Sequence, residues 1–313
     1  MAHFADRLLD AIDSTRSYLA VGLDPDPAAM PPQLLGEPAT LADAADAAER
    51  FCRAIVDGVA GIVPAVKPQS AFFEQFGAAG IAALQRLIAH ARQAGLLVIE
   101  DAKRGDIGTT MEAYATALLG RAPLAGGDAP VHDADATTLS PYLGADSLTP
   151  MVDAAARHGK GLFVLVRTSN PGSGDLQLLQ AADGRRLFEH VAVMVAQLGA
   201  DDLGERGFSS VGAVTGLTFP EDAATLRTLM PHSLFLVPGL GPQGGRSADF
   251  PLFLNEDGQG AIAAAARAIA SGWRTQPEGD DPVERVRRGA QATAEQANKE
   301  LRQGLLETGR WRW

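Results

Sequence analysis

One stretch decides the fold: Leu96-Leu97-Val98-Ile99-Glu100-Asp101-Ala102-Lys103-Arg104-Gly105-Asp106-Ile107-Gly108-Thr109-Thr110. Four apolar residues lead into alternating charges, and glycine then interrupts the pattern ahead of a helical segment. This order is typical of a buried parallel strand with charged groups at its carboxyl end, although a solvated strand end is the competing interpretation. Because side chains at i and i+2 lie on one face of a strand, we expect Asp101 and Lys103 to lie side by side, with Cα atoms about 6.6 Å apart. Asp106 follows in a loop that can carry it to the same site or to a neighbouring subunit.

Seven further segments of strand character alternate with helical patterns along the 313 residues, and no linker divides them. This alternation favours the α/β class and a single (β/α)8 TIM barrel with a C-terminal helical extension. We expect one domain over residues 1–313, with the barrel at about 17–273 and a polar helix from Asp281 to Glu307 covering it. The tail from Arg310 to Trp313 is expected to pack on the protein or to be a frayed end rather than to form a binding motif. The seven additional strands are expected at 17–24, 61–67, 135–139, 161–166, 210–215, 233–238 and about 260–265.

The segments between the strands carry their own signals. Helical patterns cover about 40–60 and 77–94, and Thr109 with Glu112 has the spacing of a capping box for the helix after the opening stretch. Residues 121–134 resemble an acidic surface loop. Residues 168–181 follow the fifth strand, and their Ser, Asn, Pro and Gly content suits a loop that moves as a lid.

Composition excludes several classes of function. The net charge is −11 and the basic residues are spread along the chain, so we expect no nucleic-acid partner. The N-terminus is acidic and no long apolar segment is present, which argues against a signal peptide and a membrane span. The single cysteine, Cys52, cannot form an internal disulfide and is expected to be a small buried residue. We therefore expect a cytoplasmic protein.

Charged residues follow the first three expected strands. Asp24, Lys67, Asp101 and Lys103 should meet at the mouth of the barrel, where two ammonium groups face two carboxylates. The lysines should lower the pKa of their carboxylate neighbours and the carboxylates should raise the pKa of the lysines, so that all four stay charged near neutrality. This disfavours a Schiff-base lysine, which must be neutral to react.

A glycine-rich stretch follows the seventh strand, from Val237 to Gly245. Backbone N–H groups of such a loop can converge on an anion, and barrels often hold phosphate at this position, although a plain turn uses the same residues. Gln243 is a candidate phosphate donor. Arg267 and Arg246 compete for the role of a forked charge on the phosphate, and a solvated surface arginine is the alternative for both. The six histidines lack ligand spacing and no nucleotide-binding glycine motif is present, so we expect neither a metal nor a cofactor.

Four segments together resemble orotidine 5′-phosphate decarboxylase, and more narrowly its longer bacterial branch typified by mycobacteria. The resemblance extends from about residue 20 to 270, and its most specific part is the Asp-x-Lys-x-x-Asp pattern together with Lys67. It implies a homodimeric barrel that converts orotidine 5′-phosphate to UMP and CO2 without metal or cofactor. The segments are Lys67-Pro-Gln-Ser-Ala-Phe-Phe-Glu74, Asp101-Ala-Lys103-Arg-Gly-Asp106-Ile-Gly-Thr-Thr110, Thr168-Ser-Asn-Pro-Gly and Pro238-Gly-Leu-Gly-Pro-Gln-Gly-Gly245.

The resemblance also implies roles for individual residues. Lys103 would protonate C6 of the pyrimidine, Asp101 would face the departing carboxylate, and Asp106 would reach in from the second subunit. The remaining contacts would be with the substrate's other groups: Asp24 and Lys67 with the ribose hydroxyls, Thr110 across the dimer, Ser169 or Thr168 with the pyrimidine edge, and Gln243, Gly244 and Arg267 with the 5′-phosphate.

Two other functions remain open. Related barrels that share Asp-x-Lys-x-x-Asp are Mg²⁺-dependent sugar-phosphate decarboxylases or aldolases, but the positive charge of Lys67 would oppose a metal bound by Asp101. From a different class, the chain could bind a nucleotide phosphate without catalysis.

Overall fold

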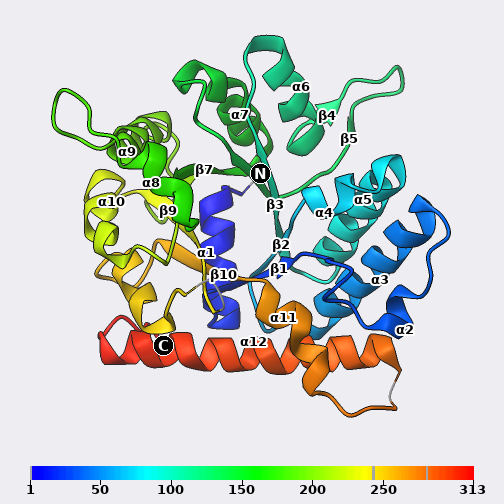
Figure 1. The fold of residues 1–313 in the computed structure, drawn as a ribbon. Coiled ribbons are helices and arrows are strands. Elements are labelled where there is room, and N and C mark those ends of the chain that lie inside the picture. The colour runs from blue at the N-terminus through cyan, green and yellow to red at the C-terminus, as the bar shows by residue number, and fades with distance from the viewer. Residues whose placement is uncertain (1, 242–243, 280) are drawn as a thin grey trace.

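The computed structural model describes residues 2–241, 244–279 and 281–313. Within these residues, eight parallel strands close into a barrel in the order β1-β2-β3-β6-β7-β8-β9-β10, with helices around it (Figure 1). The strands are β1 (Leu19–Leu23), β2 (Ala65–Pro68), β3 (Leu97–Arg104), β6 (Ala136–Leu139), β7 (Gly161–Arg167), β8 (Ser209–Thr215), β9 (Ser233–Pro238) and β10 (Ala261–Ala265). The barrel confirms the fold class predicted from the alternating pattern.

The helices of the described chain alternate with these strands, and short 3₁₀ turns lie at 171–173, 220–222, 247–253 and 272–275. The helices are α1 (Phe4–Thr15), α2 (Pro32–Leu35), α3 (Leu41–Val59), α4 (Ala71–Glu74), α5 (Gly77–Gln93), α6 (Gly108–Leu118), α7 (Ala145–His158), α8 (Gly174–Gln177), α9 (Leu187–Leu198), α10 (Ala223–Leu229), α11 (Arg267–Ser271) and α12 (Pro282–Glu307).

The strands are short and almost entirely buried, as expected where helices cover the sheet and side chains fill the barrel. The second strand begins at Ala65, four residues later than the pattern suggested, because residues 60–62 form a turn in which Gly61 has a φ of 76°. The eighth strand, rich in alanine, lies close to the first. A Cβ atom on Gly22 would overlap the side chain of Ala266, so glycine permits this approach.

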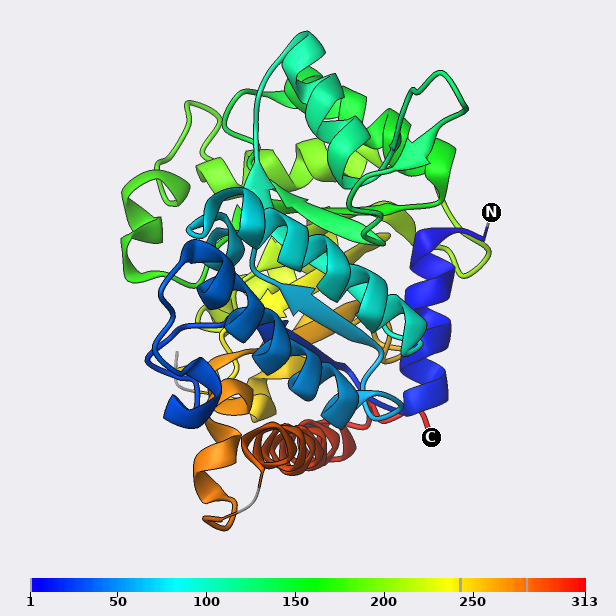
Figure 2. The same cartoon turned by 90° about the vertical axis from the view of Figure 1, so that its right-hand side faces the viewer.

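Helix α1 covers the amino-terminal end of the barrel, as Figure 2 shows on the side where the N-terminus is marked. Its Phe4 ring stands edge-on to Phe163, 6.0 Å between centroids. A side chain at Gly161 would collide with that ring, so the glycine at the start of β7 makes room for the helix. Closure at this end leaves the carboxyl end of the barrel for function.

Helix α12 runs along one side of the barrel against α3 (Figure 1). It begins where the sequence predicts, since the Asp281 side chain accepts a hydrogen bond from the Glu284 amide. The tail beyond it packs, as expected: Trp311 and Trp313 lie against the core and Arg312 pairs with Asp13 at 2.8 Å.

Two local predictions were wrong. Helix α6 begins at Gly108 with Ile107 as its cap residue, and no side chain caps it, so Thr109 does not form the expected capping box. The segment 121–134 is not a plain loop, because β4 (Arg121–Ala122) and β5 (Ala129–Pro130) pair in it as an antiparallel hairpin. Among the described helices, none combines the length and the apolar character that a membrane crossing requires.

Candidate active site

A cavity of about 960 Å³ opens at the carboxyl ends of the barrel strands. Four charged residues predicted from strand ends line it together, which confirms that they meet: Asp24, Lys67, Asp101 and Lys103. The opposite wall comes from the segment after β7, the start of the glycine-rich stretch and the first turns after β10.

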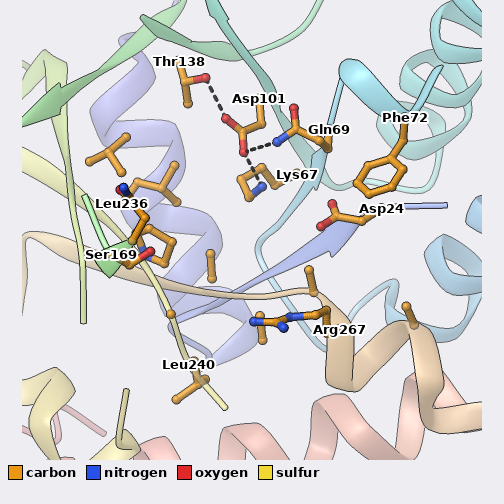
Figure 3. A pocket seen from close by; sticks show the side chains of 18 of the residues that line it. Asp24, Lys67, Gln69, Phe72, Asp101, Thr138, Ser169, Leu236, Leu240 and Arg267 are labelled. Carbon is orange, nitrogen blue, oxygen red and sulfur yellow. Dashed lines mark hydrogen bonds and ion pairs between the residues drawn. The ribbon is translucent and has the colours of Figure 1, made fainter. Parts of the chain in front are cut away.

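Asp101 lies at the centre of this group, with both carboxylate oxygens hydrogen-bonded (Figure 3). Its Oδ1 accepts from Lys103 Nζ at 2.6 Å and from Thr138 Oγ1 at 2.8 Å. Its Oδ2 accepts from Lys67 Nζ at 2.6 Å and from Gln69 Nε2 at 3.1 Å. Two positive charges and two neutral donors thus hold one carboxylate in place.

The charges of this cluster shift the pKa values of its buried members. Burial alone would raise the pKa of Asp101, but Lys67 and Lys103 outweigh it and hold that pKa well below its usual range. Burial would lower the pKa of Lys67, but Asp101 and Asp24 outweigh it and raise that pKa. Asp101 and Lys67 therefore remain an ion pair near neutrality, as the sequence predicts.

Asp24 differs from this expectation. It directly follows β1, and burial raises its pKa, with Asp101 adding to the effect and the nearby lysines only partly offsetting it. Its Oδ1 atom is buried and has no hydrogen-bond partner among the described residues. Figure 3 shows the carboxylate directed into the cavity. A buried acceptor without a donor is costly unless a bound molecule supplies one, so this oxygen suits a ligand hydroxyl group.

Lys103 lies where β3 departs from regular geometry. Its backbone has a φ of 49°, in the left-handed region, and the register between β3 and β6 shifts between Glu100 and Arg104. Its side chain is 45% exposed, whereas that of Lys67 is 9% exposed. Both lysines line the cavity, but Lys103 presents its ammonium group more openly, whereas Lys67 is buried against Asp101. Strain of this kind is found where a fold must hold a group in one functional position.

In the segment after β7, the hydroxyl groups of Thr168 and Ser169, the two candidates for the pyrimidine edge, differ in their hydrogen bonds. The Thr168 hydroxyl donates to Asn170 at 2.7 Å and accepts from Gln177 at 2.8 Å, so the loop itself uses it. The Ser169 hydroxyl has no partner among the described residues and lines the cavity. Gly216 lies against its backbone, where a Cβ atom would come within 2.8 Å of the Ser169 Cα. The geometry favours Ser169.

At the far end of the cavity, Arg267 begins α11 and lines the wall. Arg246 does not line it: its side chain is 75% exposed and lies 3.8 Å from Asp249. Gly244 is exposed and is likewise absent from the lining, and Gln243 lies outside the described residues. Of the two candidate arginines, Arg267 lines the cavity and Arg246 does not.

Two predicted residues are not brought into the cavity of their own chain. Asp106 is half-buried, and its Oδ1 accepts a hydrogen bond from the Ile107 amide at 2.8 Å. Thr110 is exposed on α6. Ile107, which lies between them, is 58% exposed.

Sequence reasoning missed seven polar residues of the described chain that line the cavity: Asp26, Gln69, Thr138, Asn170, Gln177, Ser271 and Arg274. Gln69 lies within the quoted segment that begins at Lys67, so its position near the strand end was a usable signal. Thr138 lies in a strand with two threonines, and only the fold shows which one faces inward. Arg274 lies in a 3₁₀ turn after α11 and donates to the Ala28 carbonyl at 2.9 Å.

The closed barrel and the charged cavity at the carboxyl ends of its strands define a (β/α)8-barrel enzyme. More narrowly, the chain belongs to the family described as orotidine 5′-phosphate decarboxylase / HUMPS, whose model matches residues 17–272.

Proteins named orotidine 5′-phosphate decarboxylase are similar to this chain over most of its length. The one from Rhodopirellula baltica is 47% identical over 271 residues, covering 86% of this chain and 88% of that protein. The one from Deinococcus radiodurans is 42% identical over 267 residues, covering 85% of this chain and 88% of that protein. Among solved structures, Leishmania donovani OMP decarboxylase superposes with a TM-score of 0.73 at 33% identity, covering 97% of this chain and 99% of that one.

Proposed function

We propose that this chain converts orotidine 5′-phosphate to UMP and CO2, the last step of de novo UMP synthesis, in the cytoplasm. The observation that carries the proposal is the Lys103 ammonium group, which lies 2.6 Å from a fully hydrogen-bonded Asp101 and is presented to a large cavity. Family membership and the names of the relatives support the choice of substrate.

The cavity offers one partner for each part of this nucleotide. Arg267 and the backbone of Gly239 and Leu240, at the start of the glycine-rich stretch, suit the 5′-phosphate. The unpartnered oxygen of Asp24 and the ammonium group of Lys67 suit the ribose hydroxyls. The Ser169 hydroxyl suits the edge of the pyrimidine ring, which places C6 toward Lys103.

The chemistry follows from these positions. The C6–carboxylate bond breaks, CO2 leaves, and the electron pair stays on C6, where the ring does not delocalise it well. The Lys103 ammonium group stabilises that charge and then transfers its proton to C6. Asp101 faces the departing carboxylate. The neutral Lys103 amine regains a proton from solvent before the next turnover.

The magnitude of the ammonium effect is limited. At an effective dielectric of about 20, two charges 4 Å apart interact by roughly 4 kcal/mol, or on the order of three decades in rate if the effect is confined to the transition state. The remainder would come from phosphate and ribose binding, which orients the ring and closes the 168–181 segment over it.

A Mg²⁺-dependent sugar-phosphate reaction is the competing function within this family of barrels. The geometry weighs against it because Asp101 is already bonded to two ammonium groups, and a divalent cation there would be repelled by both. Non-catalytic nucleotide binding would account for Arg267 in the cavity but not for the two lysine ammonium groups, of Lys67 and Lys103, that bind Asp101.

The test is the change in ultraviolet absorbance when the purified chain is mixed with orotidine 5′-phosphate and EDTA. We expect full turnover in chelator. Turnover that EDTA abolishes and Mg²⁺ restores would contradict the metal-free mechanism, and tight UMP binding without any turnover would favour the binding protein.

We also propose that the chain is a homodimer in which Asp106 and Thr110 complete the cavity of the partner. The proposal is supported by the position of both residues outside their own cavity and by the exposed Ile107 between them. A closed two-fold arrangement would cover this apolar side chain in both copies.

A further inference from the structure

We propose that Thr138 is a positioning residue for the decarboxylation: its hydroxyl fixes the Asp101 carboxylate and the Lys103 main chain relative to each other. The proposal rests on the function proposed above and adds a residue to it. Thr138 itself does not touch the reacting atoms in this account.

The hydroxyl of Thr138 connects two residues of β3, the Asp101 side chain and the Lys103 main chain. Thr138 is buried in β6, and its Oγ1 atom donates to Asp101 Oδ1 at 2.8 Å (Figure 3). The same oxygen accepts a hydrogen bond from the Lys103 amide at 3.0 Å. A hydroxyl carries a single proton, so accepting from the amide directs that proton to the carboxylate.

Lys103 requires such a partner because its backbone is irregular. The ladder between β3 and β6 loses its register between Glu100 and Arg104, and Lys103 has a φ of 49°. A backbone amide at such a break needs an acceptor outside the ladder. The Thr138 hydroxyl is that acceptor, and it stabilises a conformation that L-residues rarely adopt.

Lys103, Asp101 and Thr138 are hydrogen-bonded to one another in a closed cycle. Lys103 binds Asp101 through its ammonium group and Thr138 through its amide, and Thr138 binds the same carboxylate oxygen that the ammonium group binds. Loss of the hydroxyl would remove one of the four donors that hold the Asp101 carboxylate and would leave the Lys103 amide without its acceptor, so both could shift. Both movements change where the ammonium group points. Arg267, assigned to the phosphate, and Asp24, assigned to ribose, make no hydrogen bond to Thr138 or Lys103 among the described residues. The effect should therefore fall mainly on kcat rather than on KM.

The neighbouring Thr137 is a matched control. It is equally buried in the same strand, and its hydroxyl also makes one bond across to β3, to the Glu100 carbonyl at 3.0 Å. Thr137 does not line the cavity. Thr137→Val therefore removes a buried hydroxyl bond between the same two strands without touching Asp101 or Lys103.

The experiment compares kcat and KM for the wild type, Thr138→Val, Thr138→Ser and Thr137→Val, all checked for folding by circular dichroism. We expect Thr138→Val to lower kcat about 10- to 100-fold, with KM changed by less than about threefold, because misplacement of a catalytic group by an ångström costs about this much. Thr138→Ser keeps the hydroxyl and should restore most of the rate. Thr137→Val should keep the wild-type kcat.

The proposal is overturned if Thr138→Val keeps the wild-type kcat, if Thr138→Ser is as slow as Thr138→Val, or if Thr137→Val is equally slow. An inactive wild type would instead refute the proposed function. In that case a crystal structure of Thr138→Val tests the positioning role directly. If the Lys103 backbone and ammonium group keep their wild-type positions, the proposed role of Thr138 is overturned.

Discussion

At the scale of single residues, Asp101 determines the charge balance of the site. Two ammonium groups and two neutral donors bind its carboxylate, so it stays ionised although it is buried. It can therefore face the substrate carboxylate with a full negative charge. Asp24 differs from Asp101 in both respects. Burial raises its pKa, and its Oδ1 atom has no hydrogen-bond donor among the described residues.

Arg267 and Arg246, the two candidates for binding the phosphate, give a residue-scale prediction. Arg267→Ala should raise KM for orotidine 5′-phosphate about 10- to 100-fold, because a charge-assisted bond to a phosphate contributes roughly 1.5–3 kcal/mol. Arg246→Ala should change KM by less than about twofold, since that side chain does not line the cavity. Steady-state kinetics of both variants measure this. The reverse order of effects would show that the anion lies elsewhere.

The sequence predicted the charged centre of the site because strand ends of a parallel barrel meet at one face. It did not predict the neutral donors on Asp101. Thr137 and Thr138 are adjacent and alike in sequence, and only the strand register decides that Thr138 faces the cavity. The sequence likewise left Thr168 and Ser169 as alternatives, and only the structure shows that the Thr168 hydroxyl is bonded within its own loop.

At the scale of secondary-structure elements, the segment that contains β4 and β5 contacts β3 through His132. His132 follows this hairpin, and its ring lies 2.9 Å from the buried Glu100 carboxylate on β3. Ser70, which precedes α4, donates to the same carboxylate at 3.0 Å. Glu100 therefore ties together two connecting segments behind Asp101.

The His132–Glu100 pair predicts a pH-dependent stability. Burial would lower the pKa of His132, but hydrogen bonding and attraction to Glu100 outweigh it and raise the pKa above the model-peptide value of 6.5. A raised pKa in the folded state gives stability that is complete below pH 6.5 and is lost as pH rises through the folded-state value. The free energy of unfolding in urea should therefore fall from pH 6 upward more steeply in the wild type than in His132→Gln. Equal slopes would contradict the pairing.

Elements with a strong periodic pattern were predicted well, and those that depend on distant contacts were not. The eight barrel strands and α12 follow from burial and capping signals within their own sequence. The strands of the β4–β5 hairpin have only two residues each, so the alternation of apolar and polar residues that marks a strand cannot be recognised in them. The capping box at Thr109 failed because the helix starts earlier, at Gly108.

At the scale of the whole molecule, the barrel is closed at its amino-terminal end by α1 and flanked by α12 and the tail (Figures 1 and 2). We propose that the 313 residues form one domain, since α12 packs against α3 and the tail packs against the core. Asp106, Ile107 and Thr110 do not line the cavity of their own chain, and the proposal of a site shared between two copies rests on this.

Mixing two inactive variants tests the shared site. Lys103→Ala and Asp106→Ala should each be inactive as homodimers. A mixed dimer has one cavity with both defects and one with neither, so random re-association should restore about a quarter of the wild-type activity. Size-exclusion chromatography checks that dimers form. A mixture as inactive as its components would show that Asp106 serves its own chain or has no role.

The central claim is that the Lys103 ammonium group stabilises negative charge at C6 without a metal. The most direct measurement is the turnover of orotidine 5′-phosphate in EDTA by Lys103→Ala beside the wild type. The account predicts full wild-type turnover and a loss of at least about three decades in the variant, the amount that a charge pair in such a site contributes. A variant that decarboxylates at the wild-type rate would contradict it.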